Sequence, residues 1–294
     1  MAGAAAVASP VHLLDPFGFG RPGWQRHRRA FDPADDARDL RGLVVAVTGA
    51  NSGLGLAATR ALAARGATVF MLCRDVAKAE AARAELVGDT RLSRLDLADP
   101  ASVAALDLPA LDVLVHNAGQ LDATRHEVGG LERTVATHLV GPWRLSARVA
   151  AGQTVWVASG GLYTQKLDVD AIFAPPEPFD GVVAYARCKR AQVVVARRLG
   201  HHSMHPGWAD TPGVVTSLPR FHRLTQGILR RPEEGADTMV WLAATRPEPP
   251  GFWFDRARVP EHPLPWTRHP AEAEEVLLGR LRELTGVDPR ERSG

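Results

Sequence analysis

The stretch VTGANSGLG, residues 47–55, follows the aliphatic run at 43–48 and precedes the alanine-rich segment LAATRALAARG. Its glycines are spaced G-x-x-x-G-x-G. A strand that enters a glycine turn, with a helix leaving it, lets backbone N–H groups and the positive helix end face a phosphate. This order predicts a nucleotide-phosphate site built by the turn. A tight strand-to-helix turn that binds nothing is the alternative.

The rest of the chain alternates between two patterns. We expect strands at 43–48, 67–72, 90–96, 111–119 and 153–159. Between and after them we expect helices at 53–65, 75–87, after Pro100, at 124–150, around Tyr185, at 232–245 and at 270–285. Strands that alternate with helices predict a parallel sheet with right-handed crossovers. The expected fold is therefore a single α/β domain with a Rossmann-like doubly wound parallel sheet in three α/β/α layers.

The chain divides by composition into three parts. Residues 1–40, rich in Pro, Gly, Arg and Asp, predict an irregular extension with one helical turn. Residues 41–250 carry the alternating pattern and predict the nucleotide-binding domain, and 251–294 predict a tail whose terminal helix packs on it.

Composition narrows the function classes. The formal charge of +2 is small and the basic residues are scattered, so we expect no nucleic-acid partner. Cys73 and Cys188 are the only cysteines, which favours a reducing compartment over a disulfide scaffold. No apolar run is as long as a membrane span, and the N-terminus lacks a basic secretory start, so we expect a cytoplasmic protein.

The second expected strand ends at CRD, 73–75. In dinucleotide-binding folds an acidic residue here bonds the ribose 2′-hydroxyl, whereas an arginine accommodates a 2′-phosphate. Arg74 favours a cofactor with a ribose 2′-phosphate. The neighbouring Asp75 keeps a cofactor with a free 2′-hydroxyl as the alternative. At the end of the third strand, Asp96 is placed to bond an adenine amino group.

Three residues suggest proton chemistry. Tyr185 and Lys189 in YARCK lie four residues apart and therefore share a helical face. A nearby ammonium stabilises a phenolate, so we expect Lys189 to lower the pKa of Tyr185 and make it a general acid/base. Ser159, at the end of the fifth expected strand, is placed to bond a substrate oxygen.

Together, TGANSGLG, NAG at 117–119, Ser159 before its glycines, YARCK and PGWADT resemble the short-chain dehydrogenase/reductase family over residues 41–245. The resemblance implies a seven-stranded parallel sheet, a nicotinamide cofactor and a Ser-Tyr-Lys site. It also implies that Lys189 binds the nicotinamide ribose and that Thr211 bonds the carboxamide. The expected cofactor-binding residues are Thr48, Gly49, Asn51, Ser52, Gly53, Leu54, Gly55, Arg74, Asp96, Leu97, Asn117, Ala118, Gly119, Tyr185, Lys189, Pro206, Gly207 and Thr211.

The sequence departs from the family pattern at His138 and in two shortened segments, 145–157 and 199–202. His138, in HLVG, stands where the family has an Asn that holds a proton-relay water. An imidazole can both donate and accept, so we expect His138 to belong to the catalytic set, with an altered pH dependence. The short link from 199 to 202 leaves little room for a sixth strand. His201, His202 and His205 have loose metal-like spacing without a carboxylate or thiol to complete a site, so we expect no metal.

The expected function is that of an NADP-dependent oxidoreductase acting on a carbonyl/alcohol pair, with NAD the less favoured cofactor. Trp208, Trp253 and Phe254 hint at a small apolar substrate, and a homo-oligomer is compatible with the family. Two alternatives stay open: a catalytically impaired nucleotide-binding regulatory or scaffolding protein, and an epimerase or dehydratase that uses the Tyr/Lys pair.

Overall fold

The central sheet places the carboxyl ends of its parallel strands along one edge. In this computed structural model, which describes residues 18–291, eight strands follow the order β10-β9-β8-β7-β4-β1-β2-β3. Every neighbouring pair is parallel except the last, β9 with β10. The strands span β1 (Val44–Thr48), β2 (Thr68–Cys73), β3 (Thr90–Arg94), β4 (Leu111–His116), β7 (Ala151–Val157), β8 (His202–Met204), β9 (Phe252–Phe254) and β10 (Ala257–Arg258).

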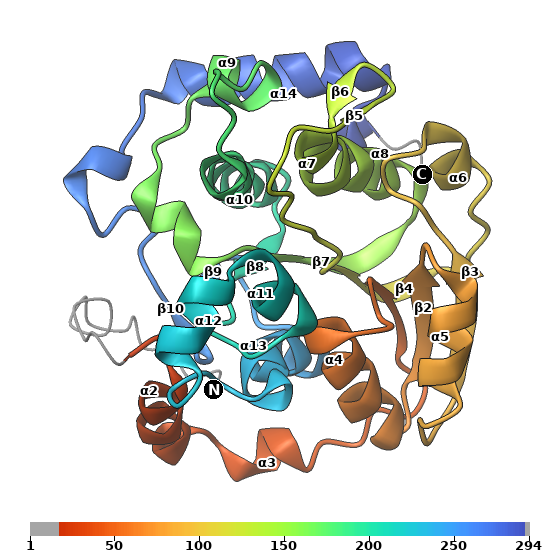
Figure 1. The fold of residues 1–294 in the computed structure, drawn as a ribbon. Coiled ribbons are helices and arrows are strands. Elements are labelled where there is room, and N and C mark those ends of the chain that lie inside the picture. Colours follow the sequence, from red (N-terminus) through yellow and green to blue (C-terminus); the bar gives the residue numbers. More distant parts are fainter. Residues whose placement is uncertain (1–17, 292–294) are drawn as a thin grey trace.

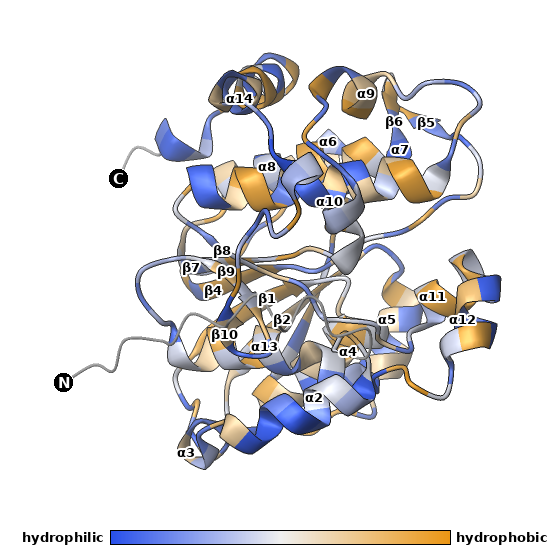
Figure 2. Ribbon diagram, turned by 90° about the vertical axis from the view of Figure 1, so that its left-hand side faces the viewer, coloured by the Kyte–Doolittle hydropathy of each residue, from blue (hydrophilic) through white to orange (hydrophobic). Residues whose placement is uncertain are grey.

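Helices cover both faces of this sheet, which confirms the three-layer α/β prediction (Figure 2). One face carries α4 (Gly53–Ala64), α5 (Val76–Arg83) and α13 (Pro232–Thr245), whose apolar residues share a core with β1 and β2. The other carries α6 (Pro100–Ala104), α7 (Arg133–Val135), η2 (Ala136–Val140), α8 (Gly141–Arg148), α9 (Val169–Phe173) and α10 (Gly181–Arg198). Outside α10 lies α14 (Ala271–Thr285), which buries Leu277, Leu278 and Leu281.

The shortened sequence around residue 200 does not break the sheet. β8 has only three residues, yet it pairs in parallel with both β7 and β9. The seven parallel strands implied by the family resemblance are therefore present, and antiparallel β10 extends them. The predicted domain boundary at 250 falls just before β9, so the tail contributes two strands to the sheet.

Two sequence predictions were wrong in detail. Residues 127–132 form the hairpin β5 (Glu127–Val128) and β6 (Leu131–Glu132), and the helix predicted over 124–150 starts only at Arg133. Gly129 and Gly130 have φ of +59° and +78°, a left-handed backbone that suits a tight hairpin turn and not a helix. The described part of the extension is also more helical than expected, with α2 (Arg21–His27), η1 (Arg28–Ala30) and α3 (Pro33–Asp36). Its first 17 residues lie outside the described range.

Another pair of helices, α11 (Pro212–Ser217) and α12 (Pro219–Thr225), follows β8 and projects beside the carboxyl edge of the sheet (Figure 1). Three short 3-10 turns complete the structure: η3 (Gly160–Thr164), η4 (Pro265–Thr267) and η5 (Pro289–Glu291).

A buried ion pair fastens the N-terminal segment to the sheet. Arg230 forms a two-pronged bond with the Asp255 carboxylate at 2.5 and 2.8 Å. The same guanidinium donates to the carbonyls of Gly18, Gly20 and Pro206. Arg230 and Asp255 expose 1% and 4% of their side chains, so the buried Arg230 charge depends on Asp255 for compensation. The Asp255 carboxylate also bonds His27 Nδ1 at 2.6 Å.

We expect Asp255→Asn to lower the free energy of unfolding by about 3–5 kcal/mol, because it leaves Arg230 buried without its counter-charge. Asp255 has φ +48°, which Asn tolerates, so the backbone should not add to the loss. Urea unfolding measures this value. As the control, Glu283→Gln breaks the exposed pair with Arg280 and should cost less than about 1 kcal/mol. Equal losses in both variants would contradict the assignment.

Candidate active site

A cavity of about 670 Å³ lies at the carboxyl edge of the sheet, where β1 and β4 meet and the chain order reverses. In doubly wound sheets ligands bind at this switch point. The cavity is lined by the ends of β1, β2, β4, β7 and β8 and by residues of α4, α10, α11 and α12. The sequence-predicted glycine turn and the Ser-Tyr-Lys residues therefore meet in one cavity.

The glycine turn forms one end of it. Gly49 and Gly53 have φ of +66° and +52°, which residues with a Cβ rarely adopt. Gly55 packs so closely that a Cβ there would lie 2.3 Å from the Gly49 carbonyl oxygen. No side chain caps the N-terminus of α4 at Ser52, which leaves the first N–H groups of the helix for a ligand. This geometry suits a phosphate.

Asn117 ties β4 to β1 beside this turn. Its side-chain amide donates to the Thr48 carbonyl at 2.9 Å, and its backbone N–H donates to the Thr48 hydroxyl at 2.9 Å. The next residue, Ala118, donates to the same hydroxyl. Asn117 thus holds the strand ends in place while the backbone of 117–119 faces the cavity.

At the end of β2, Arg74 and Asp75 have different surroundings. The Asp75 carboxylate accepts the N–H of Lys78 at 3.0 Å and caps α5. Arg74 is exposed, and within residues 18–291 it forms no ion pair. Lys78, which the sequence analysis did not single out, also lines the cavity. Lys78 could have been predicted from the sequence, because it lies in the first turn of the helix that follows β2.

At the other end, Ser159, Tyr185 and Lys189 line the cavity together. The Ser159 side chain hydrogen-bonds the Tyr185 hydroxyl. The Lys189 amine lies 5.3 Å from the Tyr185 ring centre, donates to the Val157 carbonyl at 2.8 Å and donates to the Gln192 side-chain oxygen at 2.9 Å. The i, i+4 spacing on α10 brings Tyr185 and Lys189 together. Ser159 follows β7, and the packing of β7 against α10 brings it to the same place.

The prediction that Lys189 lowers the pKa of Tyr185 was wrong, because the pKa of Tyr185 is raised in the folded protein. Burial raises the pKa of Tyr185 to about 12, although the hydrogen bond with Ser159 acts in the opposite direction. Burial likewise lowers the pKa of Lys189 to about 7. Both groups lose water, and desolvation disfavours the charged form of each.

Seventeen of the expected cofactor-binding residues line the cavity, and Gly55 lies behind it as a packing residue. His138 does not line it either: its ring is fully buried, its Nε2 lies 2.9 Å from the Gln120 carbonyl oxygen and 3.1 Å from the Gln120 backbone nitrogen, and it meets the Tyr185 ring edge-on at 5.3 Å between centroids. Burial, with Lys189 nearby, lowers the pKa of His138 to about 3, so the ring is neutral at ordinary pH. The expected pH-dependent relay through this ring is therefore not supported.

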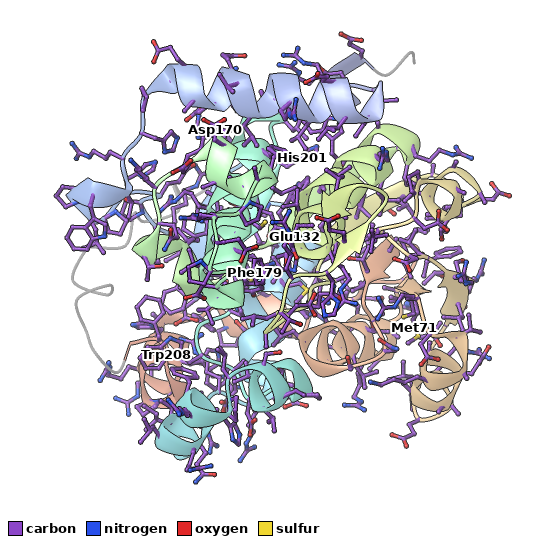
Figure 3. The ribbon with its side chains drawn as sticks, turned by 45° about the horizontal axis from the view of Figure 1, so that its top comes forward. Met71, Glu132, Asp170, Phe179, His201 and Trp208 are labelled. Atoms are coloured by element: carbon purple, nitrogen blue, oxygen red, sulfur yellow. The ribbon has the colours of Figure 1, made fainter. Side chains whose placement is uncertain are left out.

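Other sequence indications also change. Trp208 lines the cavity, stacks on Phe19 at 5.8 Å and meets Phe221 edge-on, and Figure 3 shows it near the N-terminal helix. Trp253 and Phe254 are buried core residues, so they give no information about a substrate. The three histidines separate: His201 and His202 each bond a tryptophan, whereas His205 stacks on Phe254 at 4.1 Å. Within residues 18–291, no group of three or more His, Cys, Asp or Glu residues could hold a metal ion.

Because the folded-state pKa of His138 lies below its unfolded value, the unfolded chain takes up a proton first as the pH falls below about 6.5. Stability is therefore lost in that direction. From pH 7 to 5 this one residue should cost about 2 kcal/mol of unfolding free energy. His138→Asn should remove that part of the pH dependence, measured by urea unfolding at both pH values. If wild type and variant lose the same amount, the ring is not buried in its neutral form.

Comparison with known proteins identifies relatives of the chain. Residues 43–155 match the family model for short chain dehydrogenases. The chain is 36% identical to human dehydrogenase/reductase SDR family member 12, over 90% of this chain and 93% of that protein. It is 29% identical to human retinol dehydrogenase 14, over 82% of this chain and 87% of that protein. A crystal structure from Mycobacterium paratuberculosis shares the fold, with a TM-score of 0.69, 24% identity and coverage of 85% of this chain and 96% of that one.

Within the described residues, no helix is both long and apolar enough to cross a membrane.

Proposed function

This chain belongs to the short-chain dehydrogenase/reductase family of oxidoreductases, and we propose that it transfers a hydride between NADP and a small apolar carbonyl/alcohol pair. One observation carries the proposal: Ser159, Tyr185 and Lys189 face the same cavity as the glycine turn. The cavity is thus long enough to join a phosphate-binding end to a proton-donating end.

The residues of the cavity suit a nicotinamide dinucleotide. The uncapped start of α4 and the backbone of 49–54 would hold the pyrophosphate, since an anion is stabilised at a helix N-terminus. Lys189 and Thr211 would hold the nicotinamide half. When bound, the nicotinamide supplies or accepts the hydride.

Arg74 and Lys78 support NADP over NAD. The Asp75 carboxylate caps α5 through the N–H of Lys78, whereas the two cationic side chains line the cavity beside it. A ribose 2′-phosphate would place its negative charge next to both cations, and arginine suits phosphate through its planar fork.

We expect NADPH to bind more tightly than NADH, and Arg74→Ala to weaken NADPH binding by about tenfold or more while leaving NADH binding nearly unchanged. A charge-assisted hydrogen bond is worth about 1.5–3 kcal/mol, which sets this scale. Fluorescence titration of both cofactors measures it. Arg280→Ala, on α14, is the control and should change neither affinity. Equal affinities of the parent protein for NADPH and NADH would refute the preference.

The catalytic residues supply protons to the substrate oxygen. The pKa of Tyr185, raised to about 12, keeps its hydroxyl protonated at neutral pH, where it can donate to the oxygen of a carbonyl being reduced. Ser159 offers a second hydroxyl to the same oxygen and helps to hold it. The phenolate left after donation is stabilised by the Lys189 ammonium, which lies on the same helical face. In the reverse direction Tyr185 must first lose its proton, so alcohol oxidation should gain from higher pH.

The lining beyond these groups supports an apolar substrate. Leu121, Val182, Trp208, Leu218 and Phe221 line the cavity. Ser217 closes this part by donating to the Leu121 carbonyl at 2.8 Å, which joins α11 to the loop after β4. The charged lining residues Arg74, Asp75, Lys78 and Asp96 follow β2 and β3, on the nucleotide side.

We expect Tyr185→Phe to lower turnover by roughly 10²–10⁴-fold with little change in NADPH affinity, because only the proton-donating hydroxyl is removed. Lys189→Ala should damage both, and Ser159→Ala should lower turnover with a smaller effect on binding. NADPH consumption with a panel of aldehydes, ketones and quinones measures turnover.

The chain provides a matched control, since Tyr163 is its only other tyrosine. Tyr163 is buried, and within residues 18–291 its hydroxyl has no hydrogen-bond partner. Tyr163→Phe should therefore keep parental turnover. If Tyr185→Phe did so as well, the mechanism would be refuted, and a nucleotide-binding role without redox chemistry would take its place.

A further inference from the structure

A backbone carbonyl in the helix beneath the catalytic residues has lost its usual partner. In an α-helix the carbonyl of residue i accepts the N–H of residue i+4. For His138 that residue is Pro142, which has no N–H. The helix forms the π-turn η2 over residues 136–140, just before the proline, as expected where the regular ladder is interrupted.

Gln192 occupies the position that this carbonyl leaves open. Its side-chain nitrogen donates to the His138 carbonyl at 2.7 Å, and its side-chain oxygen accepts from the Lys189 amine at 2.9 Å. Only 1% of Gln192 is exposed. Because the carbonyl can only accept and the ammonium can only donate, the two partners fix which way the amide points.

Within residues 18–291, the surroundings of Lys189 contain no compensating negative charge. The titratable groups that face it are Tyr185 and Cys188 on its own helix and His138 on η2, while β7 presents the Val157 carbonyl. Burial raises the pKa of Tyr185 and of Cys188, and it lowers that of His138. All three are therefore neutral at pH 7. The described acceptors of the amine are two neutral oxygens, those of Val157 and Gln192.

We propose that Gln192, anchored on the carbonyl freed by Pro142, is a positioning residue that holds the Lys189 amine under Tyr185 and helps it to keep its proton. The inference rests on the proposed function only for its catalytic consequence. The path from Lys189 to His138 runs through an amide, which exchanges protons too slowly to relay them. In this chain the family's relay position is thus filled by a fixed structural link, and protons must reach Tyr185 from the cavity side.

The test measures the protonation of the Lys189 amine directly, in the cofactor-free protein. The chain has only three lysines, and Lys78 and Lys166 are exposed. Labelling lysine with carbon-13 at Cε gives three NMR signals, and the Lys189 signal is identified by its loss in Lys189→Arg. Its chemical shift is followed from pH 5 to 11 in wild type, Gln192→Glu and Gln192→Met.

We expect the Lys189 midpoint to rise by about one pH unit or more in Gln192→Glu, because a carboxylate at this distance favours the charged amine. It should fall in Gln192→Met, which keeps the length of the side chain and removes both hydrogen bonds. Pro142→Ala restores an N–H that competes for the His138 carbonyl, and it should shift the midpoint in the same direction as Gln192→Met. This third variant keeps the test decisive if Gln192→Met does not fold.

Gln153→Met is the matched control. Gln153 is also a buried amide that donates to a carbonyl, that of Leu242, and within residues 18–291 it has no hydrogen bond with Lys189. Its loss should lower stability and leave the Lys189 midpoint in place. An identical midpoint in wild type and all Gln192 and Pro142 variants would overturn the inference.

Once a substrate is identified, the alkaline limb of the plot of kcat against pH should shift together with the Lys189 titration midpoint measured by NMR. If the NMR midpoint moves but the wild type reduces no substrate, the proposed function fails and the link to Lys189 stands. If Gln192 had only a structural role, its substitution would change the melting temperature but would shift neither the Lys189 titration midpoint nor the alkaline limb of the kcat profile.

Discussion

The bond between Asn117 and Thr48 is the constraint on which the site depends. A parallel sheet opens at its carboxyl edge only where neighbouring strands send their connections to opposite faces, and here that place is the β1–β4 junction. The Asn117 side-chain amide and backbone N–H hold the end of β1 through two hydrogen bonds, to the Thr48 carbonyl and the Thr48 hydroxyl. Gly55 allows α4 to start against this junction. The glycine turn and the loop after β4 consequently form two walls of one cavity.

Burial governs the chemistry at the other end of the cavity. Tyr185, Lys189 and His138 sit close enough to interact, but desolvation dominates the pKa of each and drives all three toward neutral forms. A protonated tyrosine is suited to give a proton to a carbonyl oxygen. A lysine with few charged neighbours depends on neutral acceptors for its position, which gives the amide of Gln192 its importance.

Segments from both ends of the chain support this edge. Arg230 joins Gly18 and Gly20 of the N-terminal segment to Pro206 at the end of β8 and to Asp255 after β9. Phe19 then stacks on Trp208, whose backbone N–H donates to the Phe19 carbonyl at 2.8 Å. The extension, predicted to be irregular, thus packs against the segment after β8 that carries Trp208, and Trp208 lines the cavity.

The sequence by itself determined the elements whose signals are local. The strand–glycine–helix order of 43–65 needs only neighbouring residues, because aliphatic runs, glycine and an alanine-rich helix each restrict their own backbone. The i, i+4 spacing of Tyr185 and Lys189 likewise fixes a shared helical face without reference to the rest of the chain. Both predictions were confirmed in place, as were the five strands that alternate with helices.

What depends on distant contacts was decided by the tertiary structure. The three-residue β8 forms a strand because β7 and β9 pair with it on both sides. The Gln192 amide meets the His138 carbonyl across 54 residues of sequence, so neither residue signals the other locally. The direction of the Tyr185 shift also required the fold, because the charge of a lysine can be read from a sequence, whereas the loss of water around a side chain depends on everything that packs against it.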